Sequence, residues 1–266
     1  MNEAELLFTE LLNCNRLSLY LEKDMILDRD TASLLASVLK RRISGEPIEY
    51  ILGKTEFMGY EFRVTPDVFI PRPETEILVE TVIKYATSHK PQATSLEIID
   101  LGTGSGCIAI SLAKFLSNLK LTVTDISSKA LEIARYNAIL NNVINKIRFI
   151  QSDLFDTYNL TPNTYDLVVS NPPYIPTVEI DNLQTEISYE PRIAIDGGMD
   201  GLDFYRRMIK ESPLYLKPGG FLIMEMGFNQ ANAIRDIFKN SVDYKIVDVI
   251  KDYNHIDRAI VARRNG

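Results

Sequence analysis

The amino-acid sequence predicts an α/β fold built on a doubly wound, mostly parallel sheet of seven strands, preceded by a small helical domain and a β-hairpin linker. Three observations indicate this organisation: helical periodicity in the first part of the chain, a hairpin-like alternation after it, and then a regular succession of strands and helices. The 266 residues, 45% of them hydrophobic, suffice for one main domain and a smaller one.

Apolar residues recur at helical spacing between residues 6 and 43, which predicts two or three amphipathic helices. Asp30-Thr31 is the expected N-cap of the last helix, because side-chain oxygens of these residue types accept hydrogen bonds from the first free amides. Gly45, followed by Pro47, is the expected stop. We therefore predict an N-terminal helical domain over residues 1–54.

A second segment, from Thr55 to Val64, alternates aromatic and polar residues around Gly59, which is typical of a β-hairpin. Three prolines, at positions 66, 71 and 73, then stiffen a connector. We therefore assign residues 55–73 to a hairpin linker and connector, and residues 74–266 to the main domain.

Seven apolar segments of strand length follow a helix expected from Glu74 to about Tyr85. Segments of crossover length separate the first four, which favours parallel pairing, whereas the short gap between the last two predicts an antiparallel hairpin at the sheet edge. The expected strands are residues 97–101, 121–125, 147–151, 165–170, 221–226, 245–250 and 258–262, with a helix over residues 229–238.

A glycine-rich turn follows the first expected strand. Glycine allows backbone to approach a ligand closely or to adopt positive φ, and amides at the start of the next helix favour electron-rich groups. The spacing differs from the Gly-x-Gly-x-x-Gly of dinucleotide sites because position 107 is cysteine, so a nicotinamide cofactor is the weaker interpretation. The candidate cofactor-binding residues of the turn are Gly102, Thr103, Gly104, Ser105 and Gly106.

Acidic residues stand at the ends of the first three expected strands. Ligands of open α/β sheets bind at the carboxyl ends of strands, so we expect Asp100, Asp125 and Asp153 to converge on one crevice. There Asp125 can accept hydrogen bonds from both ribose hydroxyls, and Asp153 can accept one from an adenine amino group. Carboxylates also favour a nearby positive charge. The set predicts a cavity for a nucleoside that carries a sulfonium, S-adenosylmethionine.

The fourth expected strand ends in Asn171-Pro172-Pro173-Tyr174, the most specific motif in the chain. An amide nitrogen is a poor nucleophile because its lone pair is delocalised. The Asn171 side-chain oxygen and the Pro172 carbonyl can each accept one N–H, which aims the lone pair at the sulfonium and stabilises the positive charge that develops on nitrogen. Proline stiffens the loop, and Tyr174 offers a flat face to a planar group. We predict methyl transfer to an uncharged amide or amine nitrogen.

Composition excludes several classes of protein. A net charge of −7 and a pI near 5.1 disfavour a sequence-independent grip on nucleic acid, which needs a basic footprint. Cys14 and Cys107 have no metal-type or redox-type spacing, so we expect neither a disulfide nor a metal. The first residues lack a signal-peptide pattern and no apolar run is long enough to span a bilayer, so we expect a cytoplasmic protein, and a monomer.

At these motifs, the chain resembles the HemK/PrmC family of N5-glutamine methyltransferases, which modify the glutamine of the Gly-Gly-Gln motif in peptide chain release factors. The Asn-Pro-Pro-Tyr tetrapeptide also occurs in adenine and cytosine amino-methyltransferases. Two further segments, Phe69–Glu76 and Glu190–Leu202, are similar to an active-site loop and a characteristic segment of this family. The resemblance implies a Rossmann-like class I methyltransferase that converts S-adenosylmethionine to S-adenosylhomocysteine, with release factors as its protein substrates.

The resemblance also implies roles for individual residues. It places cofactor contacts on the turn of residues 102–106 and on Asp125, Asp153, Leu154 and Asn171, where Leu154 departs from members that have an aromatic residue. It places substrate contacts on Asn171, Pro172, Pro173, Tyr174 and Phe69, with Asn171 and Pro172 as the catalytic pair. The N-terminal helical domain is then expected to help dock the release factor.

Two other functions are compatible with some of the same observations. An N6-adenine DNA or RNA methyltransferase would share the tetrapeptide, but it would need a basic target-recognition region, which the net charge and the absence of a long insertion disfavour. A non-catalytic cofactor-sensing or scaffold protein would need a degraded site, whereas every polar group that the chemistry requires is present in the sequence.

Overall fold

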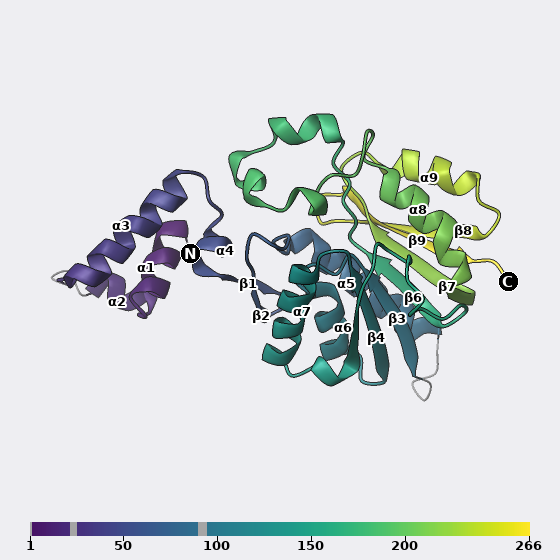
Figure 1. Cartoon of the computed structure of the whole chain (residues 1–266), viewed down its shortest axis with the longest axis horizontal. Helices are drawn as coiled ribbons and strands as arrows, with labels where there is room; N and C mark the ends of the chain where they lie inside the picture. The colour runs from purple at the N-terminus through teal and green to yellow at the C-terminus, as the bar shows by residue number, and fades with distance from the viewer. Residues whose placement is uncertain (1, 22–25, 90–94) are drawn as a thin grey trace.

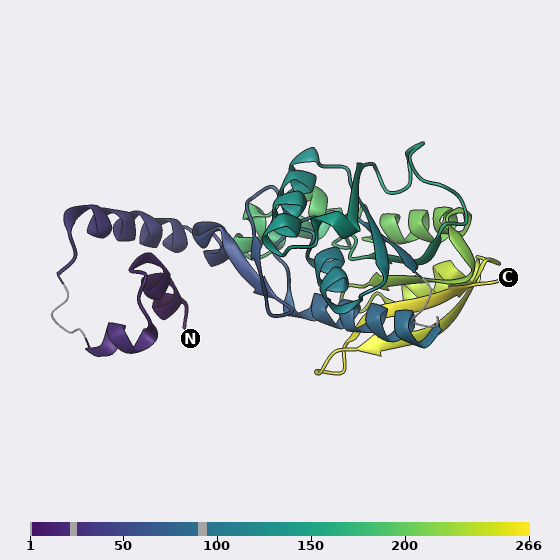
Figure 2. The ribbon, with the colours of Figure 1, turned by 90° about the horizontal axis from the view of Figure 1, so that it is seen from below.

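The computed structural model describes residues 2–21, 26–89 and 95–266. A small group of helices projects from one end of a larger α/β body (Figure 1), and the view from below shows the two joined through the hairpin region (Figure 2). The expected helical region over residues 6–43 includes positions 22–25, which lie outside the described residues. No described helix combines the length and the apolar character that crossing a bilayer requires.

The N-terminal helices are α1 Glu3–Leu11, α2 Arg16–Leu21, α3 Arg29–Ile43 and α4 Ile48–Leu52. The expected N-cap of α3 is wrong. Asp28 caps it instead, because its side chain accepts a hydrogen bond from the Thr31 amide at 2.8 Å, while Asp30 lies inside the first turn. The expected stop is confirmed: the helix ends before Gly45, whose φ of 91° is a left-handed value that favours glycine.

The β-hairpin is confirmed. Strands β1 Lys54–Phe57 and β2 Tyr60–Arg63 pair antiparallel, with Phe57 opposite Tyr60 across a two-residue turn. Met58 and Gly59 both have positive φ, as a type I′ turn requires. Buried aromatic side chains of the hairpin pack on the main domain, so the linker is part of its core. The boundaries of the three domains stay a prediction.

The main domain contains the expected seven-stranded sheet, in the order β5-β4-β3-β6-β7-β9-β8. Neighbouring strands pair parallel except where β9 pairs antiparallel with β7 and β8, so the edge hairpin is also confirmed. The fifth expected strand begins earlier than predicted. Gly219 and Gly220 are typical of a turn in sequence, but in the structure they are part of this strand. The strands are β3 Leu96–Leu101, β4 Leu119–Asp125, β5 Ile147–Gln151, β6 Tyr165–Ser170, β7 Leu216–Glu225, β8 Tyr244–Lys251 and β9 Asp257–Arg264.

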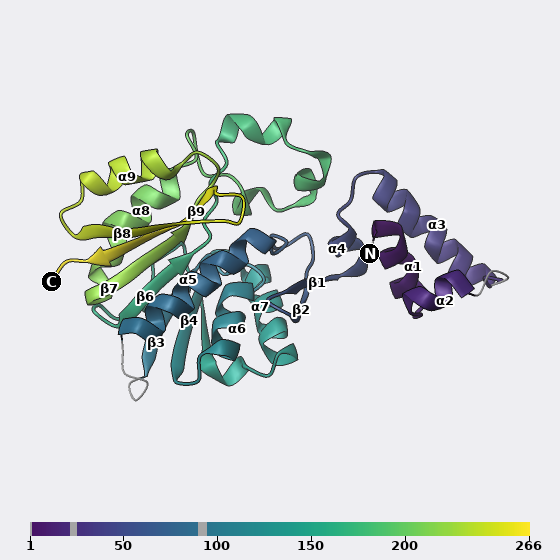
Figure 3. The ribbon, with the colours of Figure 1, turned by 180° about the vertical axis from the view of Figure 1, so that it is seen from behind.

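Helices cover both faces of this sheet (Figures 1 and 3). One face carries α5 Pro73–His89, α6 Cys107–Phe115 and α7 Ser128–Leu140, and the other carries α8 Asp203–Glu211 and α9 Ala231–Lys239. Side chains of successive strand residues alternate between the two cores: Phe221 and Ile223 face α5, while Leu222 faces α8 and α9. Short 3-10 turns are η1 Ile144–Lys146, η2 Thr177–Asn182, η3 Thr185–Tyr189, η4 Arg192–Ala194 and η5 Ser212–Leu214.

The segment with η2, η3 and η4 follows the Asn-Pro-Pro-Tyr motif and reaches toward the N-terminal helices (Figure 1). Arg42 of α3 forms an ion pair with Glu186 at 2.5 Å, and the Tyr189 hydroxyl donates a hydrogen bond to the Ser44 carbonyl at 3.1 Å. The N-terminal helices therefore contact the segment that follows the motif.

Candidate active site

A cavity of about 350 Å³ opens at the carboxyl ends of β3, β4, β5 and β6. Because these four strands are neighbours, the loops that follow them meet at one edge of the sheet. The predicted site residues on its wall are Phe69, Gly102, Thr103, Gly104, Ser105, Asp125, Asp153, Leu154, Asn171, Pro172, Pro173 and Tyr174.

The glycine turn has a backbone conformation that would be strained with residues other than glycine. Gly102 and Gly104 have φ of 68° and 55°, and a Cβ at either position would meet open space. Gly106 differs, because it caps α6 and a Cβ there would lie 3.0 Å from Ile110 and 3.2 Å from Ala134. Gly106 is not on the cavity wall, so it shapes the packing of the helix behind the turn.

The Asp125 carboxylate holds this turn from the neighbouring strand. Its two oxygens accept hydrogen bonds from the Gly104 and Ser127 amides, each at 2.9 Å. Burial raises the pKa of Asp125, and these backbone hydrogen bonds oppose the rise. Each oxygen keeps a further lone pair, so the carboxylate can still accept the two hydroxyls of a ribose.

The convergence of three aspartates is not what the structure shows. Asp125 and Asp153 lie on the cavity wall, but Asp100 is fully buried beneath the turn, where it accepts a hydrogen bond from the Thr103 hydroxyl at 2.7 Å. Its second oxygen has no hydrogen-bond partner among the described residues. Burial raises the pKa of Asp100 to about 7, with a further contribution from Asp125.

This burial predicts a pH-dependent stability. As pH rises from about 4 to about 7, an unfolded chain releases the Asp100 proton while the folded protein keeps it. The contribution of Asp100 to the free energy of unfolding therefore falls over this range. We expect Asp100→Asn to be more stable relative to the parent at pH 8 than at pH 5, as measured by urea unfolding. An equal difference at both pH values would contradict this expectation.

Asp153 and Leu154 form the part of the wall that follows β5. Asp153 forms an ion pair with Arg207 of α8 at 2.9 Å, and Arg207 also lines the cavity. Leu154 is buried and has a φ of 52°, which is rare for a leucine and turns the chain sharply at the wall. An adenine amino group at Asp153 would therefore share the carboxylate with an arginine that the sequence analysis did not include.

Asn171 begins the loop after β6. The preceding Ser170 ties this strand to β3 by donating a hydrogen bond to the Leu101 carbonyl at 2.8 Å. The Asn171 Nδ2 donates to the Thr75 hydroxyl of α5 at 3.1 Å. Its amino group is thus engaged by the protein, and its side-chain oxygen is the end that can accept a hydrogen bond in the cavity.

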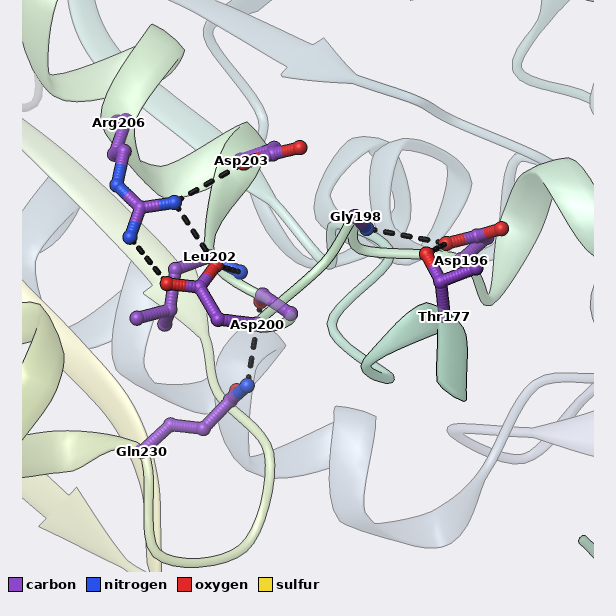
Figure 4. A network of polar contacts seen from close by, with 9 residues as sticks. Thr177, Asp196, Gly198, Asp200, Leu202, Asp203, Arg206 and Gln230 are labelled. Atoms are coloured by element: carbon purple, nitrogen blue, oxygen red, sulfur yellow. Dashed lines mark hydrogen bonds and ion pairs between the residues drawn. The ribbon is translucent and has the colours of Figure 1, made fainter. Parts of the chain in front are cut away.

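The backbone at Tyr174 and Ile175 is braced by two parts of the chain, the segment before α8 and Gln230, which is the N-cap of α9. The Gln230 Nε2 donates to the Tyr174 carbonyl at 2.8 Å and to the Gly201 carbonyl at 3.3 Å. The brace also includes a short parallel bridge between Ile175 and Asp196. Figure 4 shows how side chains stabilise this segment: Asp196 binds Thr177 and the Gly198 amide, while Asp200 pairs with Arg206 and accepts from the Leu202 amide.

Two glycines let the brace approach the motif. A Cβ at Gly197 would lie 2.8 Å from the Tyr174 Cα, and a Cβ at Gly201 would lie 2.4 Å from the Tyr174 carbonyl oxygen. Because both neighbours are backbone atoms, neither can move aside cheaply. Close packing around the loop therefore requires glycine at positions 197 and 201.

The opposite rim of the cavity contains Phe69 and Arg72. The Arg72 guanidinium lies 4.9 Å from the centre of the Phe69 ring and forms an ion pair with Glu190. Glu190 is buried and also accepts a hydrogen bond from the Ile70 amide at 3.3 Å. Burial raises the pKa of Glu190, and Arg72 opposes the rise. This ion pair connects the Phe69 loop to the segment that follows the motif.

Sequence reasoning missed several polar residues of the site. Thr75 and Arg72 lie in the segment already singled out for its resemblance, so that segment was the signal that could have found them. Nothing in the local sequence distinguishes Arg207 or Gln230, whose contacts with Asp153 and with the Tyr174 carbonyl each join residues more than 50 positions apart. In the described ranges, no cluster of three or more His, Cys, Asp or Glu side chains could hold a metal ion.

Comparison with family models matches two parts of the chain. Residues 1–53 match the PrmC N-terminal domain, and residues 73–188 match the methyltransferase small domain. The two matched segments lie on either side of the hairpin and its connector.

Known proteins are similar over nearly the whole chain. The "Release factor glutamine methyltransferase" of Geobacter sulfurreducens is 39% identical over 98% of this chain and 88% of its own length. That of Koribacter versatilis is 38% identical over 98% of this chain and 90% of its length. Among solved structures, a methyltransferase from Pyrococcus furiosus superposes with a TM-score of 0.58 over 87% of this chain and all of its own, at 19% identity, which shows a shared fold.

Proposed function

Because the chain belongs to the family of release factor glutamine methyltransferases, we propose that it transfers a methyl group from S-adenosylmethionine to a glutamine side chain of a peptide chain release factor. The acceptor is the N5 amide nitrogen of the Gly-Gly-Gln motif. The proposal includes the N-terminal helical domain over residues 1–54, the linker over 55–73 and the catalytic domain over 74–266. It also includes a monomeric enzyme in the cytoplasm, where translation terminates.

The cavity fits the nucleoside and the amino acid parts of this cofactor. Positive-φ glycines leave open space at the turn, and Asp125 presents a carboxylate that the backbone already holds in place. Asp125 would hold the ribose, and Asp153 and Leu154 would lie against the adenine. When bound, S-adenosylmethionine supplies an electrophilic methyl group on a positively charged sulfur.

The chain's own residues would make the amide nitrogen reactive. Asn171 Oδ1 and the Pro172 carbonyl would each accept one N–H of the glutamine carboxamide, which fixes its plane and directs the lone pair away from the protein. When the nitrogen gains its new bond to carbon it carries positive charge, and these two oxygens stabilise that charge. The product nitrogen then loses one proton to water or a nearby oxygen and becomes neutral.

One observation carries the proposal: Asn171 lies on the same cavity wall as the glycine turn and Asp125, with its amino group already bonded to Thr75. In the proposed reaction, that arrangement would leave the side-chain oxygen of Asn171 to accept from the substrate nitrogen. Tyr174 and Phe69 line the same cavity and would cover the planar carboxamide.

Transfer of a labelled methyl group tests this function. The protein is incubated with tritiated S-adenosylmethionine and, in separate reactions, an intact release factor, the same factor with its Gly-Gly-Gln glutamine replaced by alanine, and duplex DNA. We expect label only on the intact factor. Label on DNA would favour the N6-adenine activity instead, and equal label on the glutamine variant would reject the assigned acceptor.

Replacing Asp125 by alanine should weaken cofactor binding. The change removes the acceptor that holds the Gly104 and Ser127 amides and would hold the ribose. We expect the Kd for S-adenosylhomocysteine, measured by calorimetry, to rise about tenfold or more, the effect of losing hydrogen bonds to a charged group. Asp243→Ala, at an exposed aspartate, is the control and should leave the Kd unchanged. The same Kd for both variants would refute the role of Asp125.

A further inference from the structure

Glu225 is a buried carboxyl group that the proposed reaction does not use. It is the last residue of β7 and is only 3% exposed. Its Oε2 has no hydrogen-bond partner in the described part of the chain. Leaving a charge so poorly paired in the interior is costly, so its presence at this position needs an explanation.

Strand register places Glu225 next to Asn171. In the parallel pair of β6 and β7, Ser170 is opposite Met224, so the residues that follow them leave the sheet side by side. Helix α5 packs on the same strands and brings Thr75, which is also buried, to this place. Three polar side chains from distant parts of the chain therefore meet at the cavity wall, where Asn171 and Thr75 line the cavity and Glu225 lies behind them.

Hydrogen bonds connect these three side chains. Asn171 Nδ2 donates to the Thr75 hydroxyl at 3.1 Å. The Glu225 carboxyl lies close enough to both side chains for the Thr75 hydroxyl and the Asn171 carboxamide to lower its pKa. A carboxamide amino group has two hydrogens, so the Asn171 amino group that binds Thr75 has a second hydrogen available for Glu225. With both hydrogens bound in this way, the oxygen would be the end of the Asn171 carboxamide that faces the cavity.

We propose that Glu225, together with Thr75, is a positioning residue that holds the Asn171 carboxamide with its oxygen toward the substrate nitrogen. The inference rests on the proposed function, in which that oxygen accepts a hydrogen from the glutamine amide. If the Asn171 carboxamide were rotated by half a turn, its oxygen would face the Glu225 carboxylate, another acceptor. Its amino group would face the N–H groups of the substrate, which are also donors. The buried carboxylate prevents this rotation.

The ionisation state of Glu225 follows from its surroundings. Burial raises its pKa to about 7, Glu74 adds to the rise, and the hydrogen bonds from Thr75 and Asn171 oppose it, as does Arg258. Tyr174, Tyr205 and Cys107 also interact with its charge. An ionised carboxylate can only accept, so it holds both donors, whereas a protonated carboxyl presents a donor of its own. Turnover should therefore rise with pH through the pKa of Glu225.

Matched variants of Thr75 give the first test. Thr75→Val removes the hydroxyl at nearly constant volume, and Thr75→Ser keeps it. With a release factor as substrate and saturating S-adenosylmethionine, we expect kcat to fall about tenfold or more for Thr75→Val, the cost of one unmade hydrogen bond, with the cofactor Kd unchanged. Thr75→Ser should keep kcat within about threefold. Equal kcat values for the two variants would overturn the inference.

Titration gives a second test that does not depend on the substrate. The carboxyl carbon of Glu225 is followed by NMR in protein with ¹³C-labelled glutamate, and its signal is identified by its loss in Glu225→Gln. We expect titration near neutral pH in the parent, and at higher pH in Thr75→Val, which lacks one stabilising hydrogen bond. An unchanged titration in Thr75→Val would overturn the contact. Failure of the release factor assay with the parent protein would instead reject the proposed function, and this titration would still decide the contact.

Discussion

Replacing Asn171 by alanine should lower kcat at least about 30-fold, equivalent to roughly 2 kcal/mol or more in the barrier, because one of two acceptors for the substrate N–H groups is lost. The binding of S-adenosylmethionine should change much less, since the glycine turn and Asp125 remain. The measurement is single-turnover methyl transfer to a release factor at saturating cofactor, with the cofactor Kd obtained separately.

The matched control is Asn182→Ala, the same change at an exposed asparagine in η2. It should transfer the methyl group at the parental rate. If Asn171→Ala turned over at the parental rate, Asn171 would not be an acceptor for the substrate N–H groups. A loss of cofactor affinity equal to the loss of turnover would instead assign this residue to cofactor binding.

The second large effect is expected at Gly201, where alanine should destabilise the protein and slow the reaction together. The residue has a φ of 74°, and a Cβ would lie 2.4 Å from the Tyr174 carbonyl oxygen and 2.9 Å from Gln230 Nε2. The brace must then move away from the loop. We expect the free energy of unfolding to fall by about 2 kcal/mol or more, from strained backbone and overpacking.

Gly59 separates the two causes of that loss. Its φ of 77° is nearly the same, but a Cβ there would meet nothing within 4 Å. Gly59→Ala therefore measures the backbone strain alone, and it should cost less stability than Gly201→Ala and leave turnover intact. Urea unfolding of both variants gives the comparison. Equal destabilisation would show that the close approach to Tyr174 does not matter.

Local patterns predicted most of the fold. Strand residues such as Leu222 and Ile223 are apolar on both sides because helices cover both faces of the sheet, which is why the segments stand out as continuous apolar runs. The hairpin was predicted from the alternation around Gly59, whereas the positive φ of Met58, uncommon for a methionine, could not be predicted from the sequence. In contrast, Asp28 and Asp30 are both plausible caps, and only the distance to the Thr31 amide distinguishes them.

Apart from Phe69, which the family resemblance indicated, the candidate site was predictable where its residues follow strands directly. Asp125 and Asn171 lie at strand ends, so the parallel order of the sheet brings them together. Asp100 shows the limit of this rule, because its side chain faces the interior and not the crevice. The rest of the site depends on contacts between distant segments, such as Gln230 with the Tyr174 carbonyl, for which no local pattern exists.

The central claim is that one asparagine oxygen and one proline carbonyl hold the glutamine amide. A crystal structure of the protein with S-adenosylhomocysteine and a release factor tests it most directly. We predict that the glutamine amide nitrogen lies within hydrogen-bonding distance of both Asn171 Oδ1 and the Pro172 carbonyl oxygen, and that it faces the sulfur. A glutamine side chain bound elsewhere, or an Asn171 amino group turned toward it, would contradict the account.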